Sequence, residues 1–161
     1  MAKLEDAKES LEAEYGIKVL PVQADVSAGQ DNEAVVQNVI DKAIEEFGRI
    51  DAVVNNAQAS ASGVTIADHT MDQFNLAIYS GLYATYLYMQ KATRISRRPS
   101  SVVNFARRRP LWQLWQCSYA AAKEGIRGLS RVAANEWGPD GINVNVVCPL
   151  AWTAQLENFE A

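Results

Sequence analysis

Tyr119 and Lys123 stand four residues apart in a segment with helical spacing, so their side chains are expected on one face of a helix. A phenol can give and take a proton at a reacting oxygen, but free tyrosine titrates near pH ~10. A lysine ammonium one turn away would favour the ionised phenol and bring this exchange toward neutral pH. Such a pair taken alone is a weak signal, because tyrosine and lysine often share a helix face without doing chemistry.

A second group of residues follows the predicted strands. They are Asp25, Val26, Asn55, Asn56, Ala57, Pro149 and Thr153. Open parallel sheets bind ligands at the edge where the carboxyl ends of their strands meet. Taken singly, these residues have simpler interpretations, such as a turn at Asn55-Asn56 or a strand terminator at Pro149.

The elements that position these residues alternate along the chain. Apolar residues at helical spacing predict helices at 2–15, 32–47, 70–93 and 118–137. Short apolar runs predict strands at 17–22, 50–54, 101–105 and 142–148. Gly16 and Gly48 are expected to end the first two helices. This alternation predicts one α/β domain, residues 1–161, with a parallel sheet, right-handed crossovers and helices on both faces.

Composition and charge argue against several classes of function. The net charge of −4 argues against a general nucleic-acid binder, which needs a surplus of clustered positive charge. No apolar run reaches membrane-spanning length and no leader is recognised, so the chain is expected to be soluble and cytoplasmic. Cys117 and Cys148 lie too far apart to suggest a zinc site or a disulfide framework. His69, the only histidine, is expected to be a surface or capping detail and not a metal ligand.

Four motifs in order resemble the short-chain dehydrogenase/reductase family: Asp25-Val26, Asn55-Asn56-Ala57, Tyr119-Ala-Ala-Ala-Lys123, and Ile142-Asn-Val-Asn145 followed by Pro149 and Thr153. The resemblance runs from Lys3 to Thr153. It implies a doubly wound, Rossmann-like parallel sheet. It also implies an oxidoreductase that moves a hydride between NAD or NADP and a small-molecule carbonyl or alcohol.

The same resemblance implies roles for individual residues. Tyr119 would be the general acid/base, and Lys123 would supply positive charge and bind the nicotinamide ribose. Asp25, with Val26, would meet the adenine end of the cofactor. Asn55, Asn56 and Ala57 would line the ribose–nicotinamide channel. Pro149 and Thr153 would belong to the loop that holds the carboxamide.

The chain departs from the family pattern where ligands are held. The family's glycine-rich turn, which binds the cofactor pyrophosphate at a helix N-terminus, occurs nowhere in the sequence. Arg107 stands where the family has its substrate-orienting serine, and Gln58 replaces the glycine that usually follows Asn-Asn-Ala. The first two strands and the final strand of the family fold are missing. We therefore predict a partial Rossmann-like fold with impaired catalysis.

The predicted strand at 17–22 then lacks its usual neighbour. Backbone groups of a strand are costly when they are buried without partners. We predict that this strand pairs directly beside 50–54, as a simple right-handed crossover permits, or is poorly ordered.

Two arginine-rich stretches, 93–100 and 107–116, fit no family member. Shifting the reading frame by one nucleotide with plausible codons converts them to typical family sequence, so we hypothesise two short compensated frameshifts, which the coding DNA tests. The alternative is that arginines interleaved with tryptophans bind single-stranded nucleic acid.

The family also implies a homodimer, formed through the helices at about 70–93 and 118–137. Several tyrosines in the first of these helices suit such an interface. The alternative function is therefore a dimerising remnant of the family that does not catalyse.

Overall fold

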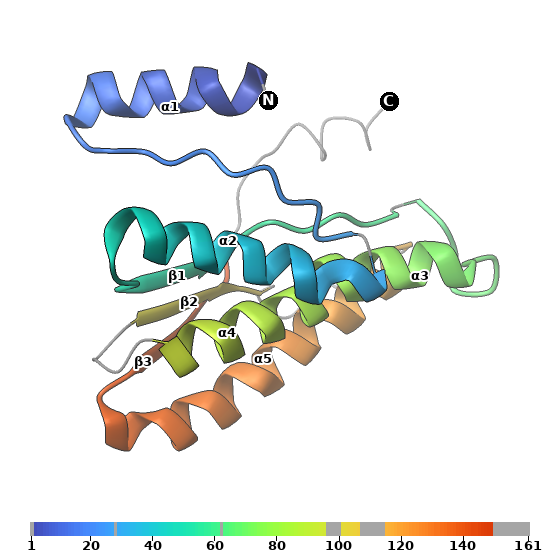
Figure 1. Ribbon diagram of the computed structural model, residues 1–161. Coiled ribbons are helices and arrows are strands. Elements are labelled where there is room, and N and C mark those ends of the chain that lie inside the picture. The colour runs from blue at the N-terminus through green and yellow to red at the C-terminus, as the bar shows by residue number, and fades with distance from the viewer. Residues whose placement is uncertain (1, 28, 62, 96–100, 107–114, 150–161) are drawn as a thin grey trace.

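The computed structural model describes residues 2–27, 29–61, 63–95, 101–106 and 115–149. Its sheet is parallel, with the order β1 (Ala52–Asn55), β2 (Ser101–Phe105) and β3 (Asn143–Val147) (Figure 1). The register places Val53 beside Val102 and Val102 beside Val144. The predicted parallel α/β sheet is confirmed in these three strands.

The helices follow the apolar periodicity closely. They are α1 (Ala2–Tyr15), α2 (Asn32–Phe47), α3 (Met71–Ala77), α4 (Ala84–Ile95) and α5 (Cys117–Trp137), with short 3-10 turns η1 (Gly29–Asp31) and η3 (Gly138–Asp140). Gly48 adopts φ 73° after α2 and donates its N–H to the Ile44 carbonyl, the left-handed stop that glycine allows. Within the part of the chain that the structure describes, no helix is long and apolar enough to cross a membrane.

The helix expected at 70–93 is interrupted by η2 (Ile78–Tyr83), a π-helical segment between α3 and α4. The buried Ser80 hydroxyl contacts the Leu76 carbonyl at 2.6 Å and also bonds Ala59 in the loop after β1. Serine bonding to the carbonyl one turn back bends helices, so Ser80 accounts for part of the distortion. Helix α5 packs tightly here, since a Cβ on Gly125 would meet the Leu82 side chain at 2.7 Å.

The core lies between one face of the sheet and the helices α2, α4 and α5, which follow one another across it (Figure 1). One cluster joins α2 to α4, with Val53 of β1 packed against it. A second cluster joins Met89 of α4, Val102 of β2 and Ala133 of α5. On the other face, Val54 is 59% exposed. Burial on the first face therefore places the helices relative to the strands.

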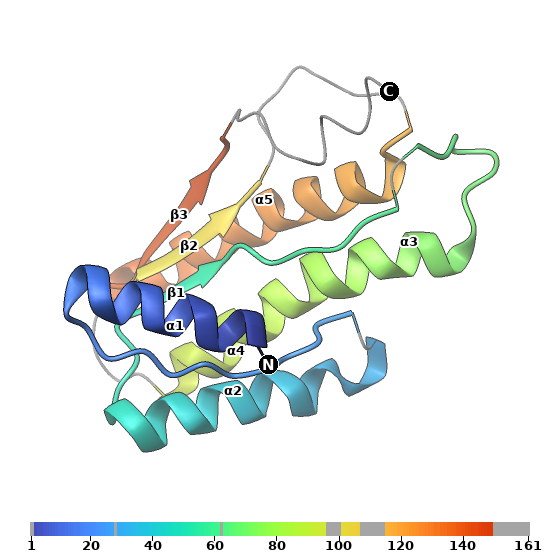
Figure 2. The same cartoon turned by 90° about the horizontal axis from the view of Figure 1, so that it is seen from above.

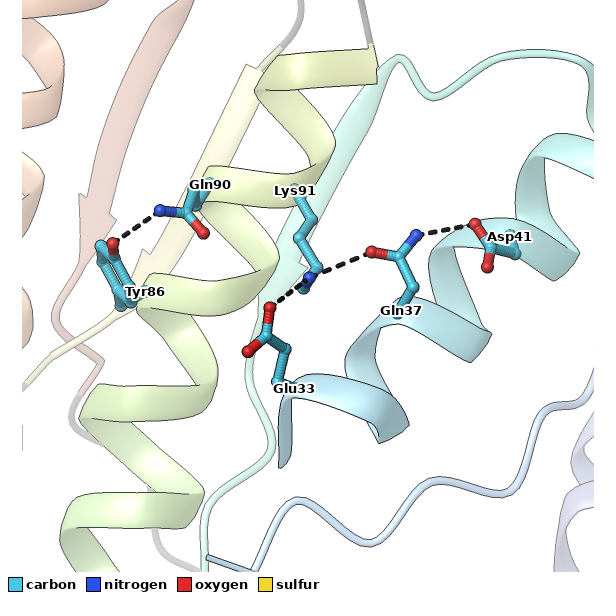
Figure 3. Close-up of polar contacts among 6 residues, drawn as sticks. All are labelled: Glu33, Gln37, Asp41, Tyr86, Gln90 and Lys91. Atoms are coloured by element: carbon cyan, nitrogen blue, oxygen red, sulfur yellow. Dashed lines mark hydrogen bonds and ion pairs between the residues drawn. The ribbon is translucent and has the colours of Figure 1, made fainter. Parts of the chain in front are cut away.

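A polar contact reinforces the packing of α2 on α4 (Figure 3). The Lys91 ammonium donates to Glu33 and to Gln37, each at 3.0 Å. The Gln37 amide donates in turn to Asp41 at 2.7 Å. Lys91 thus joins one helix to two successive turns of its neighbour.

The segment 16–25 forms no strand, so the predicted strand at 17–22 and its pairing beside β1 are wrong. The segment runs between α1 and α2 (Figures 1 and 2). Pro21 cannot donate to a ladder, and the Val19 N–H donates at 2.9 Å to the Glu12 carboxylate of α1. Proline thus removes one donor from this run and α1 takes another, and both features disfavour a strand ladder.

Candidate active site

Polar side chains meet where β1 and β2 end. Asn55 and Asn104 are register partners, and the Asn55 amide donates to the Asn104 side-chain oxygen at 2.8 Å. Asn104 is completely buried and donates to the Ser130 hydroxyl of α5 at 2.8 Å. Ser130 donates to the Ile126 carbonyl at 2.6 Å. This chain of bonds fixes the Asn55 amide relative to the helix that bears Tyr119.

A cavity of about 400 Å³ lies beside β1 and is walled by α2 and α4. Four of the predicted cofactor-binding residues line it: Val26, Asn55, Asn56 and Ala57. Most of its walls are apolar, with a few polar groups such as Ser80 and Thr85. Mostly apolar walls with a few fixed polar groups are typical of small-molecule sites.

Asp25 lies apart from this lining. Its side chain is exposed and accepts hydrogen bonds from the Ser27 hydroxyl at 2.5 Å and the Ser27 N–H at 2.9 Å. These bonds lower the pKa of the Asp25 carboxyl below its ordinary value, so the group is a carboxylate at neutral pH. The neighbouring Val26 carbonyl accepts from the Asn32 amide at 2.7 Å, which anchors the segment to α2.

Tyr119 and Lys123 lie together on the first two turns of α5. The Lys123 Nζ is 5.3 Å from the centroid of the Tyr119 ring and donates to the Phe105 carbonyl at the end of β2, at 2.9 Å. Lys123 is only 5% exposed, and this burial lowers its pKa to about 8. At pH 7 the amine is therefore still mostly charged, and its positive charge lies beside the phenol ring.

The serine just before Tyr119 has a partner that sequence reasoning missed. Ser118 is 0% exposed, and its Oγ lies 3.0 Å from Nε2 of His69. The expectation that His69 is a surface or capping detail is wrong, because the side chain is half-buried and links two helix starts. The available signal was its place beside Thr70, whose side chain caps α3.

Gln58, which stands in place of the family glycine, has a matching space on η2. A Cβ added to Gly81 would lie 2.7 Å from the Gln58 amide. The Gln58 amide nitrogen is also 3.5 Å from the Ala77 carbonyl. The Gln58 side chain is thus accommodated because Gly81 has no side chain.

Several predicted residues do not line this cavity. Tyr119 and Lys123 are not among its lining residues. Pro149 is exposed and follows β3. Thr153 and Arg107 lie outside the described residues, as does most of each arginine-rich stretch.

Sequence comparison finds a matching family model and a closely similar dehydrogenase. The family model described as Enoyl-(Acyl carrier protein) reductase matches residues 1–159. The 12alpha-hydroxysteroid dehydrogenase of a Clostridium species is 60% identical over 160 residues, which are 98% of this chain and 62% of that protein.

Solved structures agree with the sequence matches. The crystal structure of levodione reductase has a TM-score of 0.85 at 35% identity, covering 97% of this chain and 61% of that one. A blue fluorescent protein from a metagenomic library, solved in complex with NADPH, has a TM-score of 0.81 at 26% identity, covering 91% and 57%. The chain thus spans roughly three fifths of the length of these relatives. With the Tyr119–Lys123 pair, the Asn55 edge and the parallel sheet, these matches establish that the chain belongs to the short-chain dehydrogenase/reductase family.

Proposed function

We propose that this chain carries the proton-transfer half of an NAD(P)-dependent oxidoreductase that interconverts a secondary alcohol and a carbonyl. The observation that supports this most is the buried, charged Lys123 beside the Tyr119 ring. A fixed ammonium in a site with little water stabilises negative charge on a nearby phenol more than it would in solution. Tyr119 can therefore give a proton to a carbonyl oxygen or take one from an alcohol.

The residues present fit one part of a nicotinamide dinucleotide. Val26, Asn55, Asn56 and Ala57 line a cavity of about 400 Å³, which suits the flat rings and ribose of such a molecule. The pyrophosphate fits less well, since the sequence holds no glycine-rich turn to cradle it. When bound, the cofactor supplies or accepts the hydride.

Three of the chain's own residues have separate roles in the proposed reaction. Lys123 is held by the Phe105 carbonyl and keeps positive charge beside Tyr119. Asn55, fixed through Asn104, presents an oriented amide at the strand edge. Tyr119 moves the proton at the substrate oxygen. Each role needs a fixed position, which the buried bonds provide.

For the substrate we propose a hydroxysteroid-class alcohol or the corresponding ketone. The support is the 60% identity to a 12alpha-hydroxysteroid dehydrogenase, which extends over nearly the whole chain. A rigid, largely apolar substrate would contribute binding energy through buried surface.

We further propose that turnover by this chain is far below that of an intact family member. Arg107 replaces the serine that orients the substrate oxygen. Loss of one such polarising donor lowers the rate by about 100- to 1,000-fold.

The test is a calorimetric titration of the folded chain with NADH and with NADPH, followed by a turnover assay with a hydroxysteroid. We expect saturable binding of one nucleotide. We also expect slow turnover that Tyr119→Phe abolishes while binding persists. A chain that is folded by circular dichroism yet binds neither nucleotide would exclude this function.

A second candidate function is dimerisation without catalysis, through α4 and α5. Val132 on α5 is 53% exposed, and Tyr86 on α4 is exposed as well. Exposed apolar side chains on adjacent helices favour an interface. Sedimentation of the wild type and of Val132→Glu tests this; a monomer for the wild type at high concentration would exclude it.

A further inference from the structure

His69 and Ser118 join two helix starts that are far apart in the sequence. Ser118 lies in the first turn of α5, directly before Tyr119, and His69 directly precedes the N-cap of α3. The 3.0 Å contact between Nε2 and Oγ spans 49 residues of chain. It therefore fixes the start of the helix that bears Tyr119 to the end of the loop that leaves β1.

His69 is itself held in place by its neighbour. The Thr70 hydroxyl accepts from the Gln73 N–H at 3.2 Å, and the Gln73 side chain accepts from the Thr70 N–H at 3.0 Å. This reciprocal capping box orders the first turn of α3. The imidazole thus extends from a rigid point and not from a free loop.

The direction of the hydrogen bond follows from the second ring nitrogen. His69 Nδ1 is buried and has no hydrogen-bond partner within the described part of the chain. A buried N–H without a partner is rarer in proteins than an under-satisfied acceptor. The proton is therefore placed on Nε2, which donates to the Ser118 hydroxyl.

A second bond ties the same loop to the same stretch of chain. The Gly63 N–H donates to the Trp115 carbonyl at 3.1 Å, three residues before Ser118. The loop is also held at its other end by Ser80, which bonds both the N–H and the carbonyl of Ala59. The loop is thus tied to α5 near its end and to η2 near its beginning.

We propose that His69 is a positioning residue, which acts through Ser118 to set the place of Tyr119 relative to the ligand-binding edge of β1. The proposal rests on the proposed function, because it assigns Tyr119 the proton transfer. On one side Tyr119 is bracketed by the His69–Ser118 bond, and on the other by Lys123, held at the end of β2. Small displacements of a reacting group lower rates steeply.

Three substitutions separate positioning from general stability. His69→Gln keeps a donor at about the place of Nε2, His69→Asn is too short to reach, and Ser118→Ala removes the acceptor. Thr65→Ala is the matched control, because it breaks the exposed hydrogen bonds between Thr65 and Asp68 in the same loop and lies outside the cavity lining. All four are first compared with the wild type by circular dichroism and thermal melting.

The readout is the Tyr119 signal in NMR spectra of protein with ¹³Cζ-labelled tyrosine, assigned with Tyr119→Phe. We expect His69→Asn and Ser118→Ala to move this signal, and His69→Gln and Thr65→Ala to leave it at the wild-type position. In the turnover assay we expect kcat to fall by about tenfold or more in His69→Asn, with NADH or NADPH affinity unchanged and His69→Gln near wild type.

The spectra need no activity, so they decide the positioning role even if the wild type neither binds nucleotide nor turns over. In that case the proposed function fails while the link from His69 to Tyr119 is still measured. An unmoved Tyr119 signal in folded His69→Asn and Ser118→Ala overturns the inference. So does an equal displacement in Thr65→Ala.

Discussion

Asn55 and Asn104 are partners in the parallel register of β1 and β2, and the Asn55 amide donates to the Asn104 side-chain oxygen at 2.8 Å. The pair continues into Ser130 on α5. One completely buried amide thereby connects the end of β1 to α5, the helix that carries Tyr119, and its removal affects both.

Asn104→Ala is expected to lower the free energy of unfolding by roughly 2–3 kcal/mol, because it removes the bonds of a fully buried amide to Asn55 and Ser130 and leaves a cavity in its place. Asn145→Ala, which removes an exposed asparagine of β3, is the control and should change stability by less than about 0.5 kcal/mol. Urea unfolding measures both. Equal effects of the two substitutions would show that the buried chain of bonds contributes nothing.

Lys123 predicts a specific pH dependence of stability. Burial lowers its pKa from 10.5 to about 8, so between these values the unfolded chain binds more protons than the folded one. The contribution of this group to the free energy of unfolding therefore rises as pH increases from about 8 to 10.5, by at most about 3 kcal/mol. Lys123→Met lacks this rise. Urea titrations of both proteins at several pH values test this, and parallel curves would contradict it.

Gly125 and Gly128 provide a matched pair on α5. Gly125→Ala places a Cβ at 2.7 Å from the Leu82 side chain and should destabilise the fold by about 1–2 kcal/mol. Nothing lies within 4 Å of a Cβ at Gly128, so Gly128→Ala should stabilise by up to about 1 kcal/mol. Thermal melting compares the stability of the two variants. The double variant Gly125→Ala/Leu82→Ala should be less destabilised than additivity predicts, and strict additivity would argue against the contact.

The contact between Lys91 and Glu33 predicts that the two residues contribute unequally to the free energy of unfolding. Glu33 is largely exposed, so Glu33→Gln should cost less than about 0.5 kcal/mol, and the loss should shrink at high salt. Lys91→Ala removes both bonds to α2 and the packing of a mostly buried aliphatic chain, so it should cost about 1 kcal/mol or more. Urea unfolding at low and high salt separates the two. A larger effect of Glu33→Gln would contradict this assignment.

Much of the fold could be predicted from local pattern alone. The bounds of α2 follow from its apolar face and from Gly48, and β2 coincides with the apolar run at 101–105. The segment at 17–22 was predicted wrongly as a strand. An apolar pattern indicates that residues are buried, but it does not show whether a neighbouring strand is available for hydrogen bonding. The π-helical segment η2 was equally hidden, since residue spacing does not reveal that Ser80 contacts Leu76 one turn back and Ala59 twenty-one positions away.

The candidate site, like the fold, could be predicted only where it depends on local spacing. Tyr119 and Lys123 could be paired from spacing, because one helical turn separates them. His69 and Ser118 could not, because their contact depends on how α3 packs against α5. The space that Gly81 leaves for Gln58 is also a tertiary relationship. Spacing rules therefore predict neighbours within an element, whereas contacts between elements require the packing itself.

The outer edge of β1 has a consequence for handling the protein. Within the described residues β1 pairs with β2 alone, and its Val54 side chain is largely in water. An open strand edge is a template on which another chain can add by backbone hydrogen bonding. Raising the protein concentration is therefore expected to promote strand addition at this edge, which light scattering measures.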